Sequence, residues 1–113
     1  MDTLKLYNIN FMPEAFLELE DIRRYIAYNL QNPFDAEKHY DDILKAAYGL
    51  KIFPNRGSLL HNNSYANRDY RKIFVHNYTI IYYVEGDTVY IVDILYSASD
   101  IASKFEGEVN GNF

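Results

Sequence analysis

Hydrophobic residues recur three or four positions apart in two segments of the N-terminal half, 13–30 and 33–53. This spacing places them along one face of a helix. Each segment begins with proline, which is tolerated in a first helical turn because its missing N–H would have no partner there, and Asn32 can cap the second helix. The second helix must end before Pro54, since residues ahead of proline avoid the helical conformation. The pattern predicts two antiparallel helices joined by a tight connection.

The C-terminal half carries a different pattern, with three β-rich runs at Tyr70–Val75, Tyr78–Val84 and Thr88–Tyr96. Connections of two and three residues separate them, and such short connections join only antiparallel neighbours. The last run is apolar on both faces, which predicts a strand with neighbours on each side. An alternating segment at Leu4–Phe11 predicts a further strand before the helices.

These elements predict an α+β fold, in which a helical hairpin packs on one face of a small antiparallel sheet and the first strand joins the sheet edge. A single domain is expected over residues 1–105 of the 113-residue chain. Within it, Asn55–Asp69 has no periodicity and predicts a loop, and Ser97–Phe105 predicts a short helix. Residues 106–113 are expected to form a frayed tail.

The composition narrows the range of functions. The net charge is −5 and the pI is about 5.0, which argues against broad electrostatic binding to nucleic acid. The absence of cysteine excludes disulfides, thiolate catalysis and zinc sites built on cysteine. No apolar run reaches the length of a membrane helix, and the first residues do not resemble a signal peptide, so we expect a cytoplasmic protein without membrane contact.

Aromatic residues are abundant, with 12 Tyr and 7 Phe. They serve either sheet formation or partner binding. The two predicted helices can cover only one face of the sheet, so the other face would be open to a partner. We assign Ile81 and Tyr83 to that open face. Tyr25 and Tyr28 lie off the apolar stripe of the first helix beside two arginines, as interface anchors often do.

The order of the elements and three phrases of sequence, Leu19–Tyr28, Leu50–Gly57 and Tyr70–Tyr82, resemble the RelE/ParE superfamily of bacterial toxins, also known as the plasmid stabilisation family. The resemblance implies a toxin component of a type II toxin–antitoxin system that needs no cofactor. It also implies a cognate antitoxin partner, bound in a heterodimer or heterotetramer. ParE-like members poison DNA gyrase, whereas RelE-like members cut mRNA on the ribosome.

The chain departs from the RelE-like pattern at three places. Thr79 stands where the family typically has arginine, 97–100 replaces a basic pair, and Phe105 stands where a tyrosine is expected. RNA cleavage needs cations to stabilise the phosphate and groups that transfer protons. The departures therefore favour a ParE-like toxin that inhibits a target such as gyrase. Such a toxin acts by binding and need not itself be an enzyme. The alternatives are a RelE-like ribosome-dependent mRNA endonuclease or a non-toxic member that still binds antitoxin.

Five residues remain as candidates for polar chemistry. Arg71, Lys72 and His76 are the catalytic candidates if the protein is a nuclease, and Arg56 and Arg68 complete a basic cluster that would contact a target. Four of them have a structural alternative: Arg71 as a strand-end side chain paired with a carboxylate, His76 as a turn residue, and the loop arginines Arg56 and Arg68 as scattered surface charges.

Other charged residues give no site. No histidine is spaced with other ligands in a metal-binding pattern, so no metal site is predicted. The adjacent Asp41 and Asp42 lie on the polar side of the second helix, where we expect them to be solvated.

Overall fold

The computed structural model describes residues 4–29, 33–60 and 68–96. Their elements are, in chain order, β1 (Asn8–Phe11), α1 (Pro13–Asn29), α2 (Pro33–Gly49), β2 (Ser58–Leu59), β3 (Arg71–Val75), β4 (Tyr78–Glu85) and β5 (Thr88–Leu95). The predicted helix at 97–105 and the tail 106–113 lie outside the described residues. None of the helices in the described ranges is long and apolar enough to cross a membrane.

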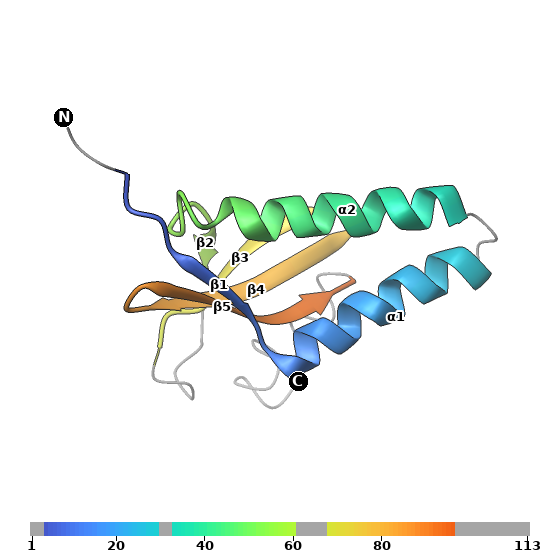
Figure 1. The fold of residues 1–113 in the computed structure, drawn as a ribbon. Helices are drawn as coiled ribbons and strands as arrows, with labels where there is room; N and C mark the ends of the chain where they lie inside the picture. Colours follow the sequence, from blue (N-terminus) through green and yellow to red (C-terminus); the bar gives the residue numbers. More distant parts are fainter. Residues whose placement is uncertain (1–3, 30–32, 61–67, 97–113) are drawn as a thin grey trace, which may run out of the picture.

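The strands form one sheet in the order β1-β5-β4-β3-β2 (Figure 1). The antiparallel β3–β4–β5 meander is confirmed, and β5 has neighbours on both sides as predicted. The first strand joins the edge, but it runs parallel to β5, so the sheet is mixed rather than purely antiparallel. It is also shorter than predicted, because residues before Asn8 leave the sheet and the Tyr7 N–H donates to the Lys51 carbonyl instead.

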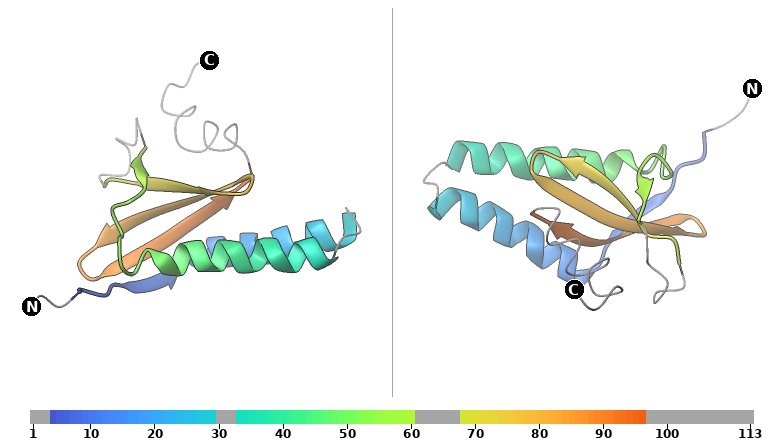
Figure 2. Two further views of the ribbon diagram at one scale, coloured as in Figure 1. Left: turned by 90° about the horizontal axis from the view of Figure 1, so that it is seen from above. Right: turned by 180° about the vertical axis from the view of Figure 1, so that it is seen from behind.

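Both helices lie side by side on one face of the sheet (Figures 1 and 2). The predicted apolar stripes provide the helical part of the core, where Leu19 and Ile43 are fully buried. Each such side chain contributes about 1.5–3 kcal/mol by leaving water. The other buried members of this core are Ala15, Ala47, Leu50, Tyr78, Ile80, Tyr82, Val89, Ile91 and Ile94.

The opposite face of the sheet differs from the prediction. Ile81 is fully buried in a second cluster with Leu60 and Leu95, and Tyr83 is only 9% exposed. The expected open apolar face is therefore wrong at these positions. The reason is that the predicted loop contains β2, which pairs with β3, and the Leu60 N–H donates to the Tyr70 carbonyl.

Candidate partner-binding surfaces

The segment after α2 is fixed by the hydroxyl of Tyr82, which rises from β4 on the helical side of the sheet. This hydroxyl donates to the Pro54 carbonyl at 2.7 Å and accepts from the Gly57 N–H at 3.0 Å. Burial raises the pKa of Tyr82, while the hydrogen bond with Gly57 and the nearby arginines partly offset the rise. One buried hydroxyl thus satisfies two backbone groups of a segment without regular structure.

Arg71 and Arg56 reinforce the same segment from its two sides. The Arg71 Nη1 donates to the Gly57 carbonyl at 2.7 Å and to the Asn55 carbonyl at 3.2 Å, rather than pairing with a carboxylate as the structural alternative supposed. The Arg56 Nη2 donates to the Ala46 carbonyl near the C-terminus of α2 at 3.3 Å, where a cation also complements the helix dipole. Both guanidinium groups therefore hold backbone carbonyls.

The three catalytic candidates do not converge. Arg71 lies opposite Tyr82 in the β3–β4 register, whereas Lys72 lies opposite Ile81 and so points to the other face of the sheet. His76 occupies the turn at the far end of β3, with its φ of 56° in the left-handed region. A phosphate bound near any one of these residues would not contact all three.

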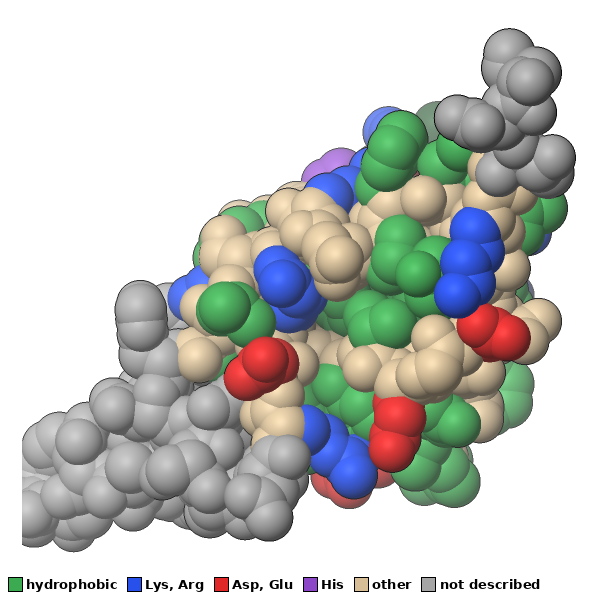
Figure 3. Space-filling model, turned by 90° about the vertical axis from the view of Figure 1, so that its left-hand side faces the viewer, with side chains coloured by type: hydrophobic (Ala, Val, Ile, Leu, Met, Phe, Trp, Pro, Cys, Tyr) green, Lys and Arg blue, Asp and Glu red, His purple; other side chains and the backbone are tan. Residues whose placement is uncertain are grey.

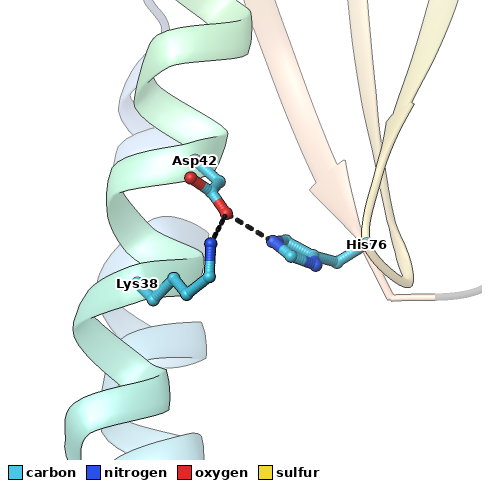
Figure 4. Close-up of polar contacts among 3 residues, drawn as sticks. All are labelled: Lys38, Asp42 and His76. Carbon is cyan, nitrogen blue, oxygen red and sulfur yellow. Dashed lines mark hydrogen bonds and ion pairs between the residues drawn. The ribbon is translucent and has the colours of Figure 1, made fainter.

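His76 instead belongs to a polar cluster between α2 and the β3–β4 turn (Figure 4). Its Nε2 lies 2.7 Å from Asp42 Oδ2, which also accepts from Lys38 Nζ at 3.1 Å. These contacts, with His76 first, lower the pKa of Asp42 below its ordinary value of 3.8. Asp42 is therefore a paired residue, and the expectation that it is merely solvated is wrong. His39 stacks on His76 with ring centroids 4.0 Å apart.

A tyrosine groove opens between α1 and the sheet. It has a volume of about 290 Å³ and is lined by Asp21, Ile22, Tyr25, Tyr78 and Tyr96. The Tyr78 and Tyr96 rings meet edge-on at 5.5 Å, and burial raises the pKa of Tyr78. Tyr25 was predicted to contact a binding partner. Tyr78 of β4 and Tyr96 just after β5, which line the groove with it, were not.

Tyr28 lies on the same helix as Tyr25, outside the lining of the tyrosine groove, and is 74% exposed. Both tyrosines predicted on α1 are therefore accessible, and of the two only Tyr25 is among the residues that line the tyrosine groove. A concave apolar site buries more of a partner side chain than an isolated surface residue does.

Arg68 and Tyr83, both predicted to bind a partner, lie together on the opposite face of the sheet. The Arg68 guanidinium lies 4.1 Å from the centroid of the Tyr83 ring, which stacks on Tyr90 at 4.9 Å and meets Tyr70 edge-on. The Arg68 guanidinium and the rings of Tyr90 and Tyr70 therefore surround the Tyr83 ring, which is only 9% exposed.

Three carboxylates that no sequence pattern connects lie together beside β5. The carboxylate oxygens of Glu14, Glu18 and Asp93 are within 4.8 Å of one another. Oxygen donors at this spacing suit a hard divalent cation, but Glu18 also accepts the Ile94 N–H at 2.7 Å. Periodicity gives no signal for the cluster, because its members come from α1 and from a mostly apolar strand.

Comparisons with known proteins identify the family and the fold of the chain. The chain matches a family model described as the ParE toxin of the type II toxin–antitoxin system parDE over residues 9–101. It is similar to a solved structure of the chromosomal ParDE toxin–antitoxin system from P. aeruginosa, with 18% identity and a TM-score of 0.66, covering 82% of this chain and 98% of that one. At this identity the likeness shows the fold. Curated protein sequences give no match.

Proposed function

Because the chain belongs to the ParE toxin family of type II toxin–antitoxin systems, we propose that it acts by binding and inhibiting a cellular target such as DNA gyrase. We further propose that a cognate antitoxin neutralises it in the cytoplasm, in a heterodimer or heterotetramer. The observation that carries this proposal is the separation of the catalytic candidates, supported by an apolar groove with room for a side chain of a partner.

A cleavage mechanism has less support. Phosphodiester cleavage needs a base, an acid and a stabilising cation around one phosphate. Arg71 instead donates to two carbonyls, Lys72 points to the opposite face, and His76 pairs with Asp42 at the far end of the strand. A binding toxin requires none of these groups to converge.

The tyrosine groove is the proposed antitoxin contact. Tyrosine rings offer a large contact area at low entropic cost, and the groove accepts an apolar side chain between a helix and a sheet. Tyr25 is half-exposed at its rim, and Tyr78 forms its buried wall. An antitoxin helix or strand that places an aliphatic or aromatic residue here would bury the exposed rings of Tyr25 and Tyr96 against the already buried Tyr78.

The test of toxicity is inducible expression in bacteria, alone and together with the adjacent gene, with a gyrase supercoiling assay on the purified protein. Growth arrest with intact mRNA, relieved by the adjacent gene, and inhibition of supercoiling are expected. Arrest with cleaved mRNA would instead establish the endonuclease. Absence of arrest, with antitoxin binding retained, would identify a non-toxic member.

The test of the groove compares two tyrosines on the same helix. We expect Tyr25→Ser to weaken antitoxin binding by about 30-fold, which corresponds to about 2 kcal/mol. Tyr28→Ser is the matched variant, because Tyr28 is exposed but does not line the groove. If only Tyr28→Ser weakens binding, the antitoxin contacts the outer surface of α1 and the groove assignment is wrong.

A further inference from the structure

We propose that the outer edge of β1 is an interface between two copies of the chain, which pair there as antiparallel strands and join their sheets into one. β1 stands at one end of the strand order, so only one of its sides is hydrogen-bonded to a neighbouring strand. At the other end of the sheet, β2 has only two residues and offers little to pair with. This interface lies outside the tyrosine groove and does not depend on which target the toxin inhibits.

The hydrogen bonds of β1 fix which residues face outward. The Asn8 N–H donates to the Asp87 carbonyl at 2.8 Å, on the side where β5 lies. The backbone groups of successive strand residues point to alternate sides, so the N–H and C=O groups of Ile9 and Phe11 point away from β5. Within residues 4–29, 33–60 and 68–96, no strand lies on that side to pair with them.

Only one twofold register uses both outward-facing residues. With Asn10 on the symmetry axis, Ile9 of one copy lies opposite Phe11 of the other, and each such pair exchanges both of its backbone hydrogen bonds. A register centred on Ile9 would place Phe11 opposite Tyr7, whose N–H already donates to the segment after α2. A register centred on Phe11 would place Ile9 opposite Pro13, which has no N–H. The strand is therefore self-complementary about Asn10.

The side chains of β1 suit this pairing. Ile9 and Phe11 pack against the helical core, so in a dimer they would continue the apolar layer from one copy to the other. Asn8 and Asn10 are exposed on the opposite face, where the two Asn10 amides meet at the axis and can hydrogen-bond to each other. No charged residue occurs at positions 6–12, although edge strands that stay unpaired commonly carry lysine or proline.

Exposed apolar side chains flank this edge. Leu4 and Leu6 before β1, and Phe16 and Leu17 in the first turns of α1, are each more than half exposed. Figure 3 views the side of the molecule at which residues 4–7 lead into β1, and it shows hydrophobic side chains among charged side chains of both signs. Charge therefore selects no particular partner here. A second copy supplies both apolar side chains and a strand with the matching order of donors and acceptors.

The net charge gives this interface a distinctive salt dependence. Each copy carries a charge of −5, so two copies repel each other at long range. The paired residues are uncharged, so salt screens the repulsion without weakening the contacts. Self-association should therefore become tighter as the salt concentration rises, whereas an interface held by ion pairs would become weaker.

Pairing through β1 leaves the tyrosine groove accessible. Phe11 lies opposite Ile91, and Tyr96 lies beyond the end of β5, roughly 17 Å further along the strand. A dimer would therefore present two open grooves and could bind two antitoxin segments. This consequence, a heterotetramer, is the only part of the inference that rests on the proposed function.

The first test places charges at the symmetry axis. Asn10→Lys and Asn10→Glu each bring like charges together in a dimer, so each should weaken self-association in analytical ultracentrifugation by about 10-fold or more. An equimolar mixture of the two variants should restore the dimer, because opposite charges then meet. Asn77→Lys is the matched control, since Asn77 is exposed in the β3–β4 turn and should leave association unchanged. Circular dichroism verifies that each variant is folded.

The second test checks the register with a disulfide. The chain has no cysteine, so Asn10→Cys introduces a single thiol. In the dimer it would face its copy at a Cα separation of about 4.5 Å, which a disulfide can span. Oxidised glutathione should therefore link this variant into a covalent dimer. Asn8→Cys is the control and should link at least about 10-fold more slowly, because its two copies would lie roughly 14 Å apart along the paired strands.

Four results would overturn the proposal. A wild-type chain that stays monomeric up to about 1 mM would show that the edge does not pair with itself. A dimer that neither Asn10 variant weakens would place the interface elsewhere, and equal cross-linking of the two cysteine variants would exclude the register. A monomer whose β1 amides gain protection from hydrogen exchange only when the antitoxin is added would assign the edge to a strand of the antitoxin.

Discussion

Replacement of Tyr82 by phenylalanine tests how the segment after α2 is held. The change removes one oxygen atom and leaves the ring in the core. It deletes the hydrogen bond to the Pro54 carbonyl and leaves the Gly57 N–H without the acceptor that it has at 3.0 Å. The Arg71 Nη1 still donates to the Gly57 carbonyl and the Arg56 Nη2 to the Ala46 carbonyl, so the segment loses one of its attachments and keeps the others.

The expected cost follows from these two backbone groups. A buried polar group that loses its partner costs about 1–3 kcal/mol, and access of water through the exposed Asn55 and Arg56 between the two groups reduces that penalty. We therefore expect the free energy of unfolding to fall by about 2–4 kcal/mol. For a chain of this size the melting temperature should fall by about 6–15 °C. Urea denaturation followed by circular dichroism measures the change, with the m-value expected to remain constant.

Tyr83→Phe is the matched control, because it removes the same atom from the next residue of β4, on the opposite face of the sheet. Its ring contacts with Arg68 and Tyr90 do not need the hydroxyl, so its free energy of unfolding should change by less than about 0.5 kcal/mol. If Tyr82→Phe were equally neutral, the Tyr82 hydroxyl would not anchor the segment, and the reasoning above would be refuted.

Three further predictions concern single positions. Gly86→Ala should lower the free energy of unfolding by about 1–2 kcal/mol in urea denaturation, because Gly86 has a φ of 63°. The cost comes from the backbone, since an added Cβ meets no atom. Gly86→Asn should cost less, and equal costs for the two variants would contradict the backbone explanation. Gly57→Ala should cost about 2–3 kcal/mol, since its Cβ would lie 2.5 Å from the Tyr82 hydroxyl; an unchanged melting temperature would contradict it. Asp42 has a lowered pKa, caused first by His76, so its stabilising effect is present above pH 3.8 and is lost as the pH falls through the folded-state pKa. The advantage of the wild type over Asp42→Asn should therefore shrink as the pH falls below 3.8, and an advantage that stays constant there would exclude this role.

The sequence was sufficient for features that depend on local periodicity. The helical stripes placed Leu19 and Ile43 in the core, and the short connection at His76 set the β3–β4 register that pairs Lys72 with Ile81. The same alternation implies that Arg71 and Lys72 face opposite sides of the sheet. The prediction of one basic cluster that contains both residues did not take this into account. The family resemblance was also correct, because it rested on the order of these elements.

The functional surfaces required the tertiary structure. Tyr82 and Gly57 are 25 residues apart, and Asp42 and His76 are 34 apart. Their contacts depend on how the helices are rotated and translated over the sheet, and no local pattern specifies either quantity. The short strand β2 was missed for a related reason, since two residues carry too little periodicity to reveal a strand.

Taken alone, the sequence determined the α+β class, the two helices and the meander, because residue spacing and short connections fix each element and its immediate neighbours. The RelE/ParE superfamily was indicated separately, by a resemblance in particular phrases of sequence and in the order of the elements. Only the tertiary structure decided that Arg71 holds backbone carbonyls, that Ile81 is buried, and that an apolar groove lies between α1 and the sheet. Side-chain accessibility is a property of the packed molecule. It arises when distant segments exclude water from one another, and the chain reaches that arrangement only by folding.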